Sequence, residues 1–186
     1  MLSIKLIWST DPNGYIGDGN NLIFHSKEDL KLFKRLTTGN GNNAVVMGRR
    51  TFESIGSKPL PNRLNIVLSK DESFGFDLEL GDMLMDLHLS RNIRDVLLTC
   101  EAHSIEELWV IGGKEIYEQF IELSDEVCIT HFNEYAESSD KLIQFIPDLT
   151  QFSKPVILND LYQYTDIDYK TNKELSMFTR ILRRTK

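Results

Sequence analysis

Positive charge is scarce in this chain of 186 residues. Lysine and arginine number 21 against 28 aspartates and glutamates, so the net charge is −7 and the isoelectric point lies near 5.1. We therefore do not expect the broad basic surface that binds nucleic acids or anionic membranes. Cysteine is scarcer still: Cys100 and Cys128 form no C-x-x-C pair, and the four histidines have no zinc-ligand spacing. We expect neither a disulfide framework nor a metal site.

Long apolar runs are also missing. No run reaches the roughly 18 residues that a membrane-spanning helix needs. Met1–Lys5 lacks the basic start and apolar continuation of a signal peptide. Repeats and low-complexity tracts are absent too, whereas 41% of the residues are apolar, which is enough for a sizeable core. These features predict a single cytoplasmic domain over residues 1–186, and because nothing indicates a partner chain we expect a monomer.

Strand and helix patterns alternate along the chain. We predict buried strands at 3–9, 44–47, 65–69, 108–111 and 127–132, an alternating strand at 83–89, and helices at 27–36, 51–55, 93–100 and 114–123. This order favours an α/β fold with a mostly parallel central sheet and helices on both faces. The segments 162–169 and 175–182 predict a closing antiparallel hairpin, and turn signals over 11–21 predict a long loop.

Two predicted strands turn through glycine into a helix. The first junction is Gly48 followed by Arg49, Arg50 and Thr51, and the second is the pair Gly112-Gly113 followed by Lys114. A helix N-terminus offers free N–H groups and a positive dipole, which suit phosphate groups. Any strand-to-helix turn favours glycine, however, and an arginine pair is also typical of a solvated surface. Neither junction matches the G-x-G-x-x-G or P-loop pattern.

One carboxylate occupies an unusual place. On a helix over 27–36, the apolar side chains Leu30, Leu32, Phe33 and Leu36 share one arc, and Asp29 lies near its middle. A lone acid that faces a core is costly unless it is paired or functional. The alternative is helix capping, because Ser26-Lys27-Glu28-Asp29 matches an S-x-x-D box with Ser26 as the N-cap.

Five segments in order resemble the dihydrofolate reductase family over nearly the whole chain. They are Asp11-Pro12-Asn13-Gly14-Tyr15-Ile16-Gly17, Asp29-Leu30-x-x-Phe33-Lys34, Val45-Val46-Met47-Gly48-Arg49-x-Thr51-Phe52-Glu53-Ser54-Ile55, Leu60-Pro61-Asn62-Arg63-x-Asn65-Ile66-Val67-Leu68-Ser69 and Val110-Ile111-Gly112-Gly113-x-x-Ile116-Tyr117. The resemblance implies NADPH-dependent reduction of 7,8-dihydrofolate to tetrahydrofolate, which supports one-carbon metabolism and thymidylate synthesis. It also implies the single-domain fold of that family, with an adenosine-binding lobe at approximately 43–104.

The same resemblance implies roles for individual residues. Asp29 would bind the pterin and assist its protonation, with Thr130 hydrogen-bonded behind it, and Arg63 would hold the α-carboxylate of the glutamate tail. The remaining substrate-binding residues would be Ile7, Trp8, Leu22, Phe33, Ile55, Leu60, Ile111 and Tyr117. The cofactor-binding residues would be Ser9, Ile16, Gly17, Gly48, Arg49, Arg50, Thr51, Ser69, Lys70, Ile111, Gly112, Gly113, Lys114, Ile116 and Tyr117. A cis peptide bond is expected between Gly112 and Gly113.

The chain departs from the family pattern at four places. Ile23-Phe24 replaces the usual Pro-Trp, and Trp8 is bulkier than the usual residue. The usual run of three glycines is cut to two, with Lys114 third, and Glu115 stands where an arginine often touches the cofactor. Several of the apolar residues would be buried in any fold, and Arg63 next to Pro61 is open to a reading as a surface arginine. Two rival functions are a related pterin or pyrimidine reductase and a non-catalytic nucleotide-binding module. Asp29, Phe33 and the segment that ends in Arg63 favour folate.

Overall fold

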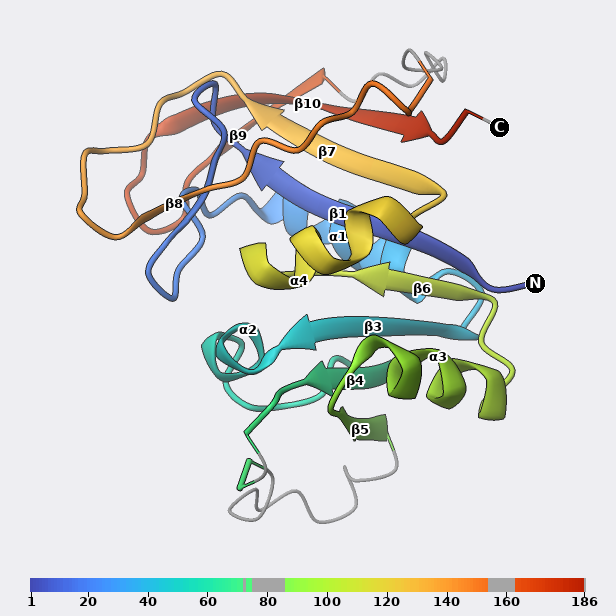
Figure 1. The fold of residues 1–186 in the computed structure, drawn as a ribbon. Coiled ribbons are helices and arrows are strands. Elements are labelled where there is room, and N and C mark those ends of the chain that lie inside the picture. Colours follow the sequence, from blue (N-terminus) through green and yellow to red (C-terminus); the bar gives the residue numbers. More distant parts are fainter. Residues whose placement is uncertain (72, 75–85, 154–162, 186) are drawn as a thin grey trace.

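Eight strands form one twisted sheet through the middle of the molecule (Figure 1). The structure is a computed structural model that describes residues 1–71, 73–74, 86–153 and 163–185. Within these residues the sheet order is β5-β4-β3-β6-β1-β7-β10-β9. The strands are β1 (Ser3–Thr10), β3 (Asn43–Gly48), β4 (Leu64–Leu68), β5 (Leu87–Ser90), β6 (Glu107–Val110), β7 (Glu126–Phe132), β9 (Gln163–Ile167) and β10 (Glu174–Arg183).

The first six strands of this order run parallel, β10 runs in the opposite direction, and β9 pairs antiparallel with β10. β1 pairs with β6 and β7 in parallel, as β3 does with β4 and β6, whereas β10 pairs antiparallel with both β7 and β9. The prediction of a mostly parallel sheet with a closing hairpin is therefore confirmed. The part of the predicted 83–89 strand that precedes Asp86, and Tyr162 of the predicted hairpin, lie outside the described residues.

Helices cover both faces of the sheet, as the sequence predicts. They are α1 (Lys27–Thr38), α2 (Arg49–Ser54), α3 (Ile93–Ala102), α4 (Lys114–Phe120) and a 3-10 turn at Ile121–Leu123. Figure 1 shows α3 and α4 in front of the sheet and α1 behind it. Side chains alternate accordingly along β1: Leu6 and Trp8 pack in the layer with α3 and α4, while Ile7 packs in the layer with Phe33 of α1.

The segment predicted as a long loop contains a strand. β2 (Tyr15–Asp18) pairs antiparallel with β8 (Leu142–Gln144), more than 120 residues away in the chain. The turn that precedes β2 is built on buried Asp11, whose carboxylate accepts hydrogen bonds from the N–H groups of Asn13, Tyr15 and Ala136. The loop prediction was wrong here because the partner strand is short and lies in a segment without a clear strand pattern.

No helix in the described part of the chain combines the length and the apolar character that crossing a membrane requires. The same residues contain no cluster of three or more histidine, cysteine, aspartate or glutamate side chains placed to hold a metal ion.

Candidate active site

A cleft of about 980 Å³ opens at the carboxyl ends of the central parallel strands. Ligands of open α/β sheets bind at this edge. The described residues that line it include every predicted site residue except Arg63 and Thr130. Of the residues expected to bind the substrate, the cleft is lined by Ile7, Trp8, Leu22, Asp29, Phe33, Ile55, Leu60, Ile111 and Tyr117. Of those expected only for the cofactor, it is lined by Ser9, Ile16, Gly17, Gly48, Arg49, Arg50, Thr51, Ser69, Lys70, Gly112, Gly113, Lys114 and Ile116.

The N-terminus of α1 carries Asp29 into this cleft, and other groups cap the helix. The Ser26 hydroxyl accepts a hydrogen bond from the Asp29 N–H at 3.1 Å and donates to Asp166 Oδ2 at 2.7 Å. The same Asp166 oxygen accepts the Glu28 N–H at 3.0 Å. Among the described residues, no hydrogen bond joins the Asp29 carboxylate to the Ser26 N–H, so Asp29 does not complete a capping box. Its side chain is left for the cleft.

The surroundings of Asp29 are apolar, and this changes its acidity. Burial raises the pKa of Asp29 to about 6, and a hydrogen bond with the Thr130 hydroxyl acts in the opposite direction. Thr130 is buried in β7 and is positioned by a 3.0 Å hydrogen bond between its Oγ1 and that of Thr179. A carboxyl with a pKa this close to neutral can both hold and release a proton under physiological conditions, which a general acid or base requires.

Leu30 is the exception to the predicted apolar arc of α1. Leu32 is buried, and Phe33 and Leu36 pack against the sheet, but Leu30 is 40% exposed and lines the cleft. Leu22, 44% exposed, lies on the segment after β2 that forms another wall. Apolar side chains that remain exposed at the mouth of a cleft are available to an apolar ligand.

Arg63 is buried, so its reading as a surface arginine is wrong. It is only 5% exposed and lies under α1. Nη1 donates to the Thr37 hydroxyl at 2.5 Å, Nε donates to the Pro61 carbonyl at 3.1 Å, and the guanidinium lies 5.9 Å from the Phe33 ring centroid. No described residue accepts a hydrogen bond from Nη2. The head group is held rigidly next to the cleft residues Phe33 and Leu60 without lining the cleft itself.

The two glycine junctions lie against each other. The Gly48 N–H donates to the Gly112 carbonyl at 2.8 Å, because β3 and β6 are neighbours in the sheet. The Gly112–Gly113 peptide bond is cis, as predicted, and Gly112 has φ +109°, where a Cβ would lie 3.0 Å from the Tyr117 hydroxyl. Gly48 and Gly113 begin α2 and α4, and no described side chain caps either helix. The first N–H groups of both helices therefore have no side-chain acceptor among the described residues, and both junctions line the cleft.

Charged groups of both signs gather around these junctions. Arg49 is engaged by acids: its Nη1 lies 2.6 Å from Asp71 Oδ2, and its Nε lies 3.4 Å from Glu53 Oε1. Arg50 and Lys70 are exposed and line the cleft, as does Glu115 on the first turn of α4. Arg50 and Lys70 line the cleft without the acidic partners that Arg49 has, and Glu115 adds a negative charge beside them.

Tertiary structure adds cleft residues that the sequence patterns do not indicate. These are Gly19, Asn20, Asn21, Leu30, Ser54, Leu68, Asp71, Arg91, Gln119 and Ile143. Arg91 follows β5 and donates through Nη1 to the carbonyls of Ser69 and Asp71. Ile143 comes from β8, whose pairing with β2 brings it to the cleft. The sequence contains a weak indication that Arg91 belongs to the cleft, because Arg91 directly follows a strand, as Arg49 does. It contains no such indication for Ile143.

Phe24 does not take part in the cleft wall among the described residues. It packs on Phe132 at 4.8 Å between ring centroids, together with Leu175, Met177 and Tyr164. His131 is packed away from the cleft lining: its ring stacks on Phe178 at 5.0 Å and its Nε2 accepts from Arg180. Burial lowers the pKa of His131 to about 4, so its ring is neutral.

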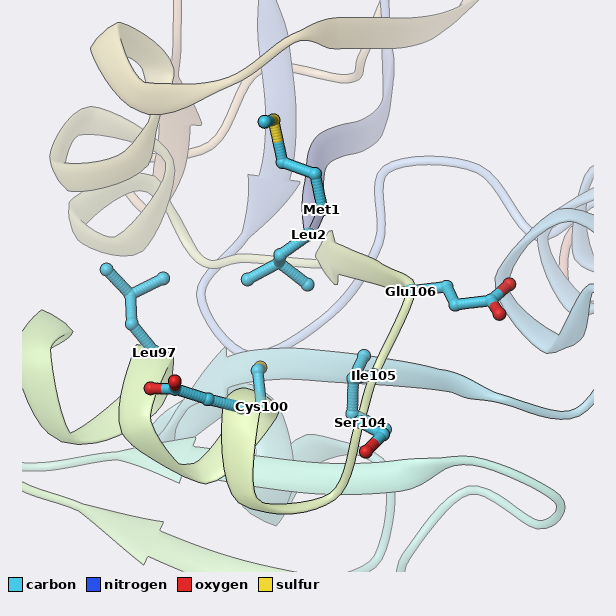
Figure 2. Close-up of a pocket in the computed structure, with 8 residues that line it drawn as sticks. Met1, Leu2, Leu97, Cys100, Ser104, Ile105 and Glu106 are labelled. Atoms are coloured by element: carbon cyan, nitrogen blue, oxygen red, sulfur yellow. The ribbon is translucent and has the colours of Figure 1, made fainter.

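A second cavity, of about 470 Å³, lies at the opposite edge of the sheet, where β1 and β6 begin (Figure 2). Leu2 at the start of β1, Leu97 and Cys100 of α3 and Ile105 before β6 surround it. Burial raises the pKa of the Cys100 thiol to about 11, so this cysteine is not a reactive thiolate. The chemistry-bearing groups are therefore in the large cleft.

Comparisons with known proteins agree with this geometry. A family model described as dihydrofolate reductase matches residues 3–154. The chain is 36% identical to the dihydrofolate reductase of Bacillus subtilis over 150 residues, which are 75% of this chain and 81% of that protein. It is 34% identical to the enzyme of Mycobacterium leprae over 152 residues, 80% of this chain and 84% of the relative.

A solved structure shares the fold. It is the dihydrofolate reductase from Enterococcus faecalis in complex with NADP(H) and RAB-propyl. The TM-score is 0.75 with 24% sequence identity, and the superposition covers 99% of this chain and 97% of the other.

Proposed function

The chain belongs to the dihydrofolate reductase family, and from this premise we propose how its cleft residues divide the work of the family's reaction. That reaction is the NADPH-dependent reduction of 7,8-dihydrofolate to 5,6,7,8-tetrahydrofolate. The observation that carries the assignment of roles is a single carboxyl group, Asp29, held in apolar surroundings at the end of a cleft whose other end offers helix N-termini and cations.

The residues present fit the cofactor. Two uncapped helix starts, Gly48 before α2 and Gly113 before α4, present N–H groups to phosphates. Thr51, Ser69, Arg50 and Lys70 add hydroxyl donors and positive charge on the same side of the cleft. Bound NADPH supplies the hydride. The chain's own task is to orient the two ligands and to exclude water between them.

Asp29 is the proposed catalytic residue. Its carboxylate holds the amino group and ring nitrogen of the pterin, and with a pKa of about 6 it supports protonation of the substrate near neutral pH. Phe33, Ile55 and Leu60 provide apolar walls for the aromatic parts of the substrate. Arg63, fixed through Thr37, presents the unused Nη2 edge of its guanidinium to the α-carboxylate of the glutamate tail.

We propose that residues 43–104 act as the adenosine-binding lobe. β3, β4 and β5 form one end of the sheet with α2 and α3, and the cations Arg50, Lys70 and Arg91 all come from this part of the chain. We further propose a cytoplasmic monomer that binds no nucleic acid. The free thiols of Cys100 and Cys128 fit a reducing compartment, and the acidic charge disfavours polyanions.

The test follows NADPH absorbance with purified protein, with and without dihydrofolate. Oxidation of NADPH that requires both protein and dihydrofolate supports the proposed function. Binding of NADPH without dihydrofolate-dependent oxidation contradicts it. A pterin without the glutamate tail separates a folate reductase from a general pterin reductase, because only the former depends on Arg63.

A further inference from the structure

Three hydroxyl groups gather behind Asp29, on the face of the sheet that α1 covers. Thr130 comes from β7, Thr179 from β10 and Tyr164 from β9, three neighbouring strands in Figure 1. Thr130 lies opposite Thr179 in the register, and Tyr164 lies opposite Met177, two residues before Thr179 on the same face. Thr130 and Thr179 are 3% and 8% exposed, so water has little access to either.

The direction of these hydrogen bonds follows from the number of protons. A threonine hydroxyl has one proton and two acceptor lone pairs. The hydrogen bond between Thr130 and the Asp29 carboxylate uses the Thr130 proton, because an ionised carboxylate only accepts. The 3.0 Å contact between Thr130 Oγ1 and Thr179 Oγ1 must then be donated by Thr179. No described residue donates to the Thr179 oxygen in turn.

Tyr164 supplies a donor that has no other use. Its hydroxyl is buried and makes no hydrogen bond with the described residues. Burial, followed by the charge of Asp29, raises the pKa of Tyr164 to about 12. The register places Tyr164 opposite Met177 on β10, so Tyr164 is a diagonal neighbour of Thr179 on the same face of the sheet. A buried hydroxyl without a partner is unfavourable, and the Thr179 oxygen, on the neighbouring strand and the same face, keeps a lone pair that could accept its proton.

We propose that Tyr164 is a positioning residue for the reaction, the last donor in a chain that runs from Tyr164 through Thr179 and Thr130 to the Asp29 carboxylate. This inference rests on the proposed function, because it concerns the acid of the same site. Each hydrogen bond polarises the next, so the Tyr164 hydroxyl strengthens the bond that Thr130 donates. The chain stabilises the ionised form of Asp29 from the side opposite the cleft.

The other titratable groups around Asp29 do not supply this effect. Tyr117 of α4 and Cys128 of β7 also sense its charge, and burial raises the pKa of both, that of Cys128 to about 12. Both are therefore neutral when Asp29 titrates. The Tyr117 hydroxyl is already engaged, since it donates to the Ile7 carbonyl at 2.8 Å. Among the described residues, Tyr164 is the buried hydroxyl left with a free proton on this side.

The proposal is tested by titrating the Asp29 carboxyl in the protein without ligands. Carbon-13 NMR of labelled aspartate reports each carboxyl, and the signal that is missing in Asp29→Asn identifies the one required. Tyr164→Phe removes only the hydroxyl, and we expect the Asp29 pKa to rise by about 0.3 to 0.7 units. Thr179→Val breaks the same chain and should shift it in the same direction, whereas Thr179→Ser should keep the original value.

The matched control is Tyr169→Phe, on the same hairpin. The Tyr169 ring packs against His25 at 5.4 Å between centroids and the residue is 47% exposed, so this variant should leave the Asp29 titration unchanged. The pH profile of kcat/KM for dihydrofolate should follow the NMR shifts in each variant. If Tyr164→Phe is poorly folded, Thr179→Val and Thr179→Ser make the same comparison.

The outcomes separate this proposal from a structural role and from the proposed function. A change in melting temperature with an unaltered Asp29 titration in both Tyr164→Phe and Thr179→Val would overturn the hydroxyl chain. A wild-type protein without dihydrofolate-dependent NADPH oxidation would overturn the proposed function instead, and the NMR titration would still decide the chain. The hydroxyl chain is supported if the Asp29 pKa rises in both Tyr164→Phe and Thr179→Val. The Asp29 pKa should then keep its original value in Thr179→Ser and in Tyr169→Phe.

Discussion

Replacing Asp29 by asparagine should make the fold more stable and the reaction slower. Burial raises the pKa of Asp29 from 3.8 to about 6, so the folded protein holds a proton that the unfolded chain has already lost. A shift of about two units at about 1.4 kcal/mol per unit means that ionised Asp29 costs about 3 kcal/mol of stability above pH 6. The cost is absent below the unfolded pKa, near 3.8. It grows as the pH rises from there toward the folded pKa of about 6, and it is complete above that value.

Asparagine keeps the shape of the side chain and carries no charge. The variant should therefore gain up to about 3 kcal/mol over the wild type at pH 8 and about half of that at pH 5. In a domain of this size each kcal/mol raises Tm by about 2 to 4 °C, so the gain at pH 8 corresponds to about 6 to 12 °C. Urea unfolding and thermal melts at the two pH values measure it.

The rate should move in the opposite direction. Loss of a positioned acid lowers the hydride-transfer rate at pH 7 by about 10²- to 10⁴-fold, with partial recovery at low pH, where solvent protonates the substrate directly. Glu28→Gln is the control, because Glu28 lies on the same turn of α1, is exposed and pairs with Lys31. It should change neither quantity appreciably.

A capping role for Asp29 predicts the reverse pattern. In that case the variant would lose about 0.5 to 2 kcal/mol of stability at both pH values and keep its turnover. A stable Asp29→Asn protein with an unaltered rate at every pH would remove Asp29 from the mechanism, and the assignment of the cleft as an active site would lose its main support.

Three further perturbations test the remaining roles. Arg63→Lys should lower kcat/KM for dihydrofolate by about 10- to 150-fold, since a lysine cannot offer the same two-pronged contact. The same change should barely affect kcat/KM for a pterin without the glutamate tail. Equal losses for both substrates would mean that Arg63 acts through folding. Wild-type protein should prefer NADPH over NADH, and Glu115→Arg should raise that preference by roughly tenfold. The control Glu118→Arg, one turn further along α4, should leave the preference unchanged. An equal or better kcat/KM with NADH in the wild type would refute the assignment of the phosphate site. Ser26→Ala and Asp166→Asn should each cost about 0.5 to 2 kcal/mol of stability in chemical unfolding, and no loss in either would mean that the cap does not hold α1.

Much of the architecture follows from patterns that are local in the chain. The strands at 3–9 and 127–132 and the helix at 27–36 were predicted close to their observed bounds, because burial imposes a period of two on strands and 3.6 on helices. The glycine junctions are predictable because each glycine stands between a strand pattern and a helix pattern, where the chain must turn. β2 and β8 were missed, since a short strand is stabilised by its partner and not by its own composition.

The candidate site was predictable where function depends on a residue type at a fixed place in a motif. Asp29, Arg63 and the pair Gly112-Gly113 occupy such places in motifs that resemble one family, and of these Asp29 and the two glycines line the cleft. The sequence could not show that Arg49 is neutralised by Asp71 and Glu53, which weakens its role toward a phosphate. Ion pairs of this kind depend on side-chain positions after folding.

Local sequence thus determined the elements, the glycine turns and an acid on an apolar helix face, because steric preference and hydrophobic periodicity act over a few residues. Whether that acid capped its helix or faced a cleft was decided only by the tertiary structure. Asp166, 140 residues away from Ser26, takes over the cap, and Thr130 brings a hydroxyl to the carboxylate from another strand. A pKa and a hydrogen-bond direction depend on every group packed around a side chain, and only the folded chain brings those groups together.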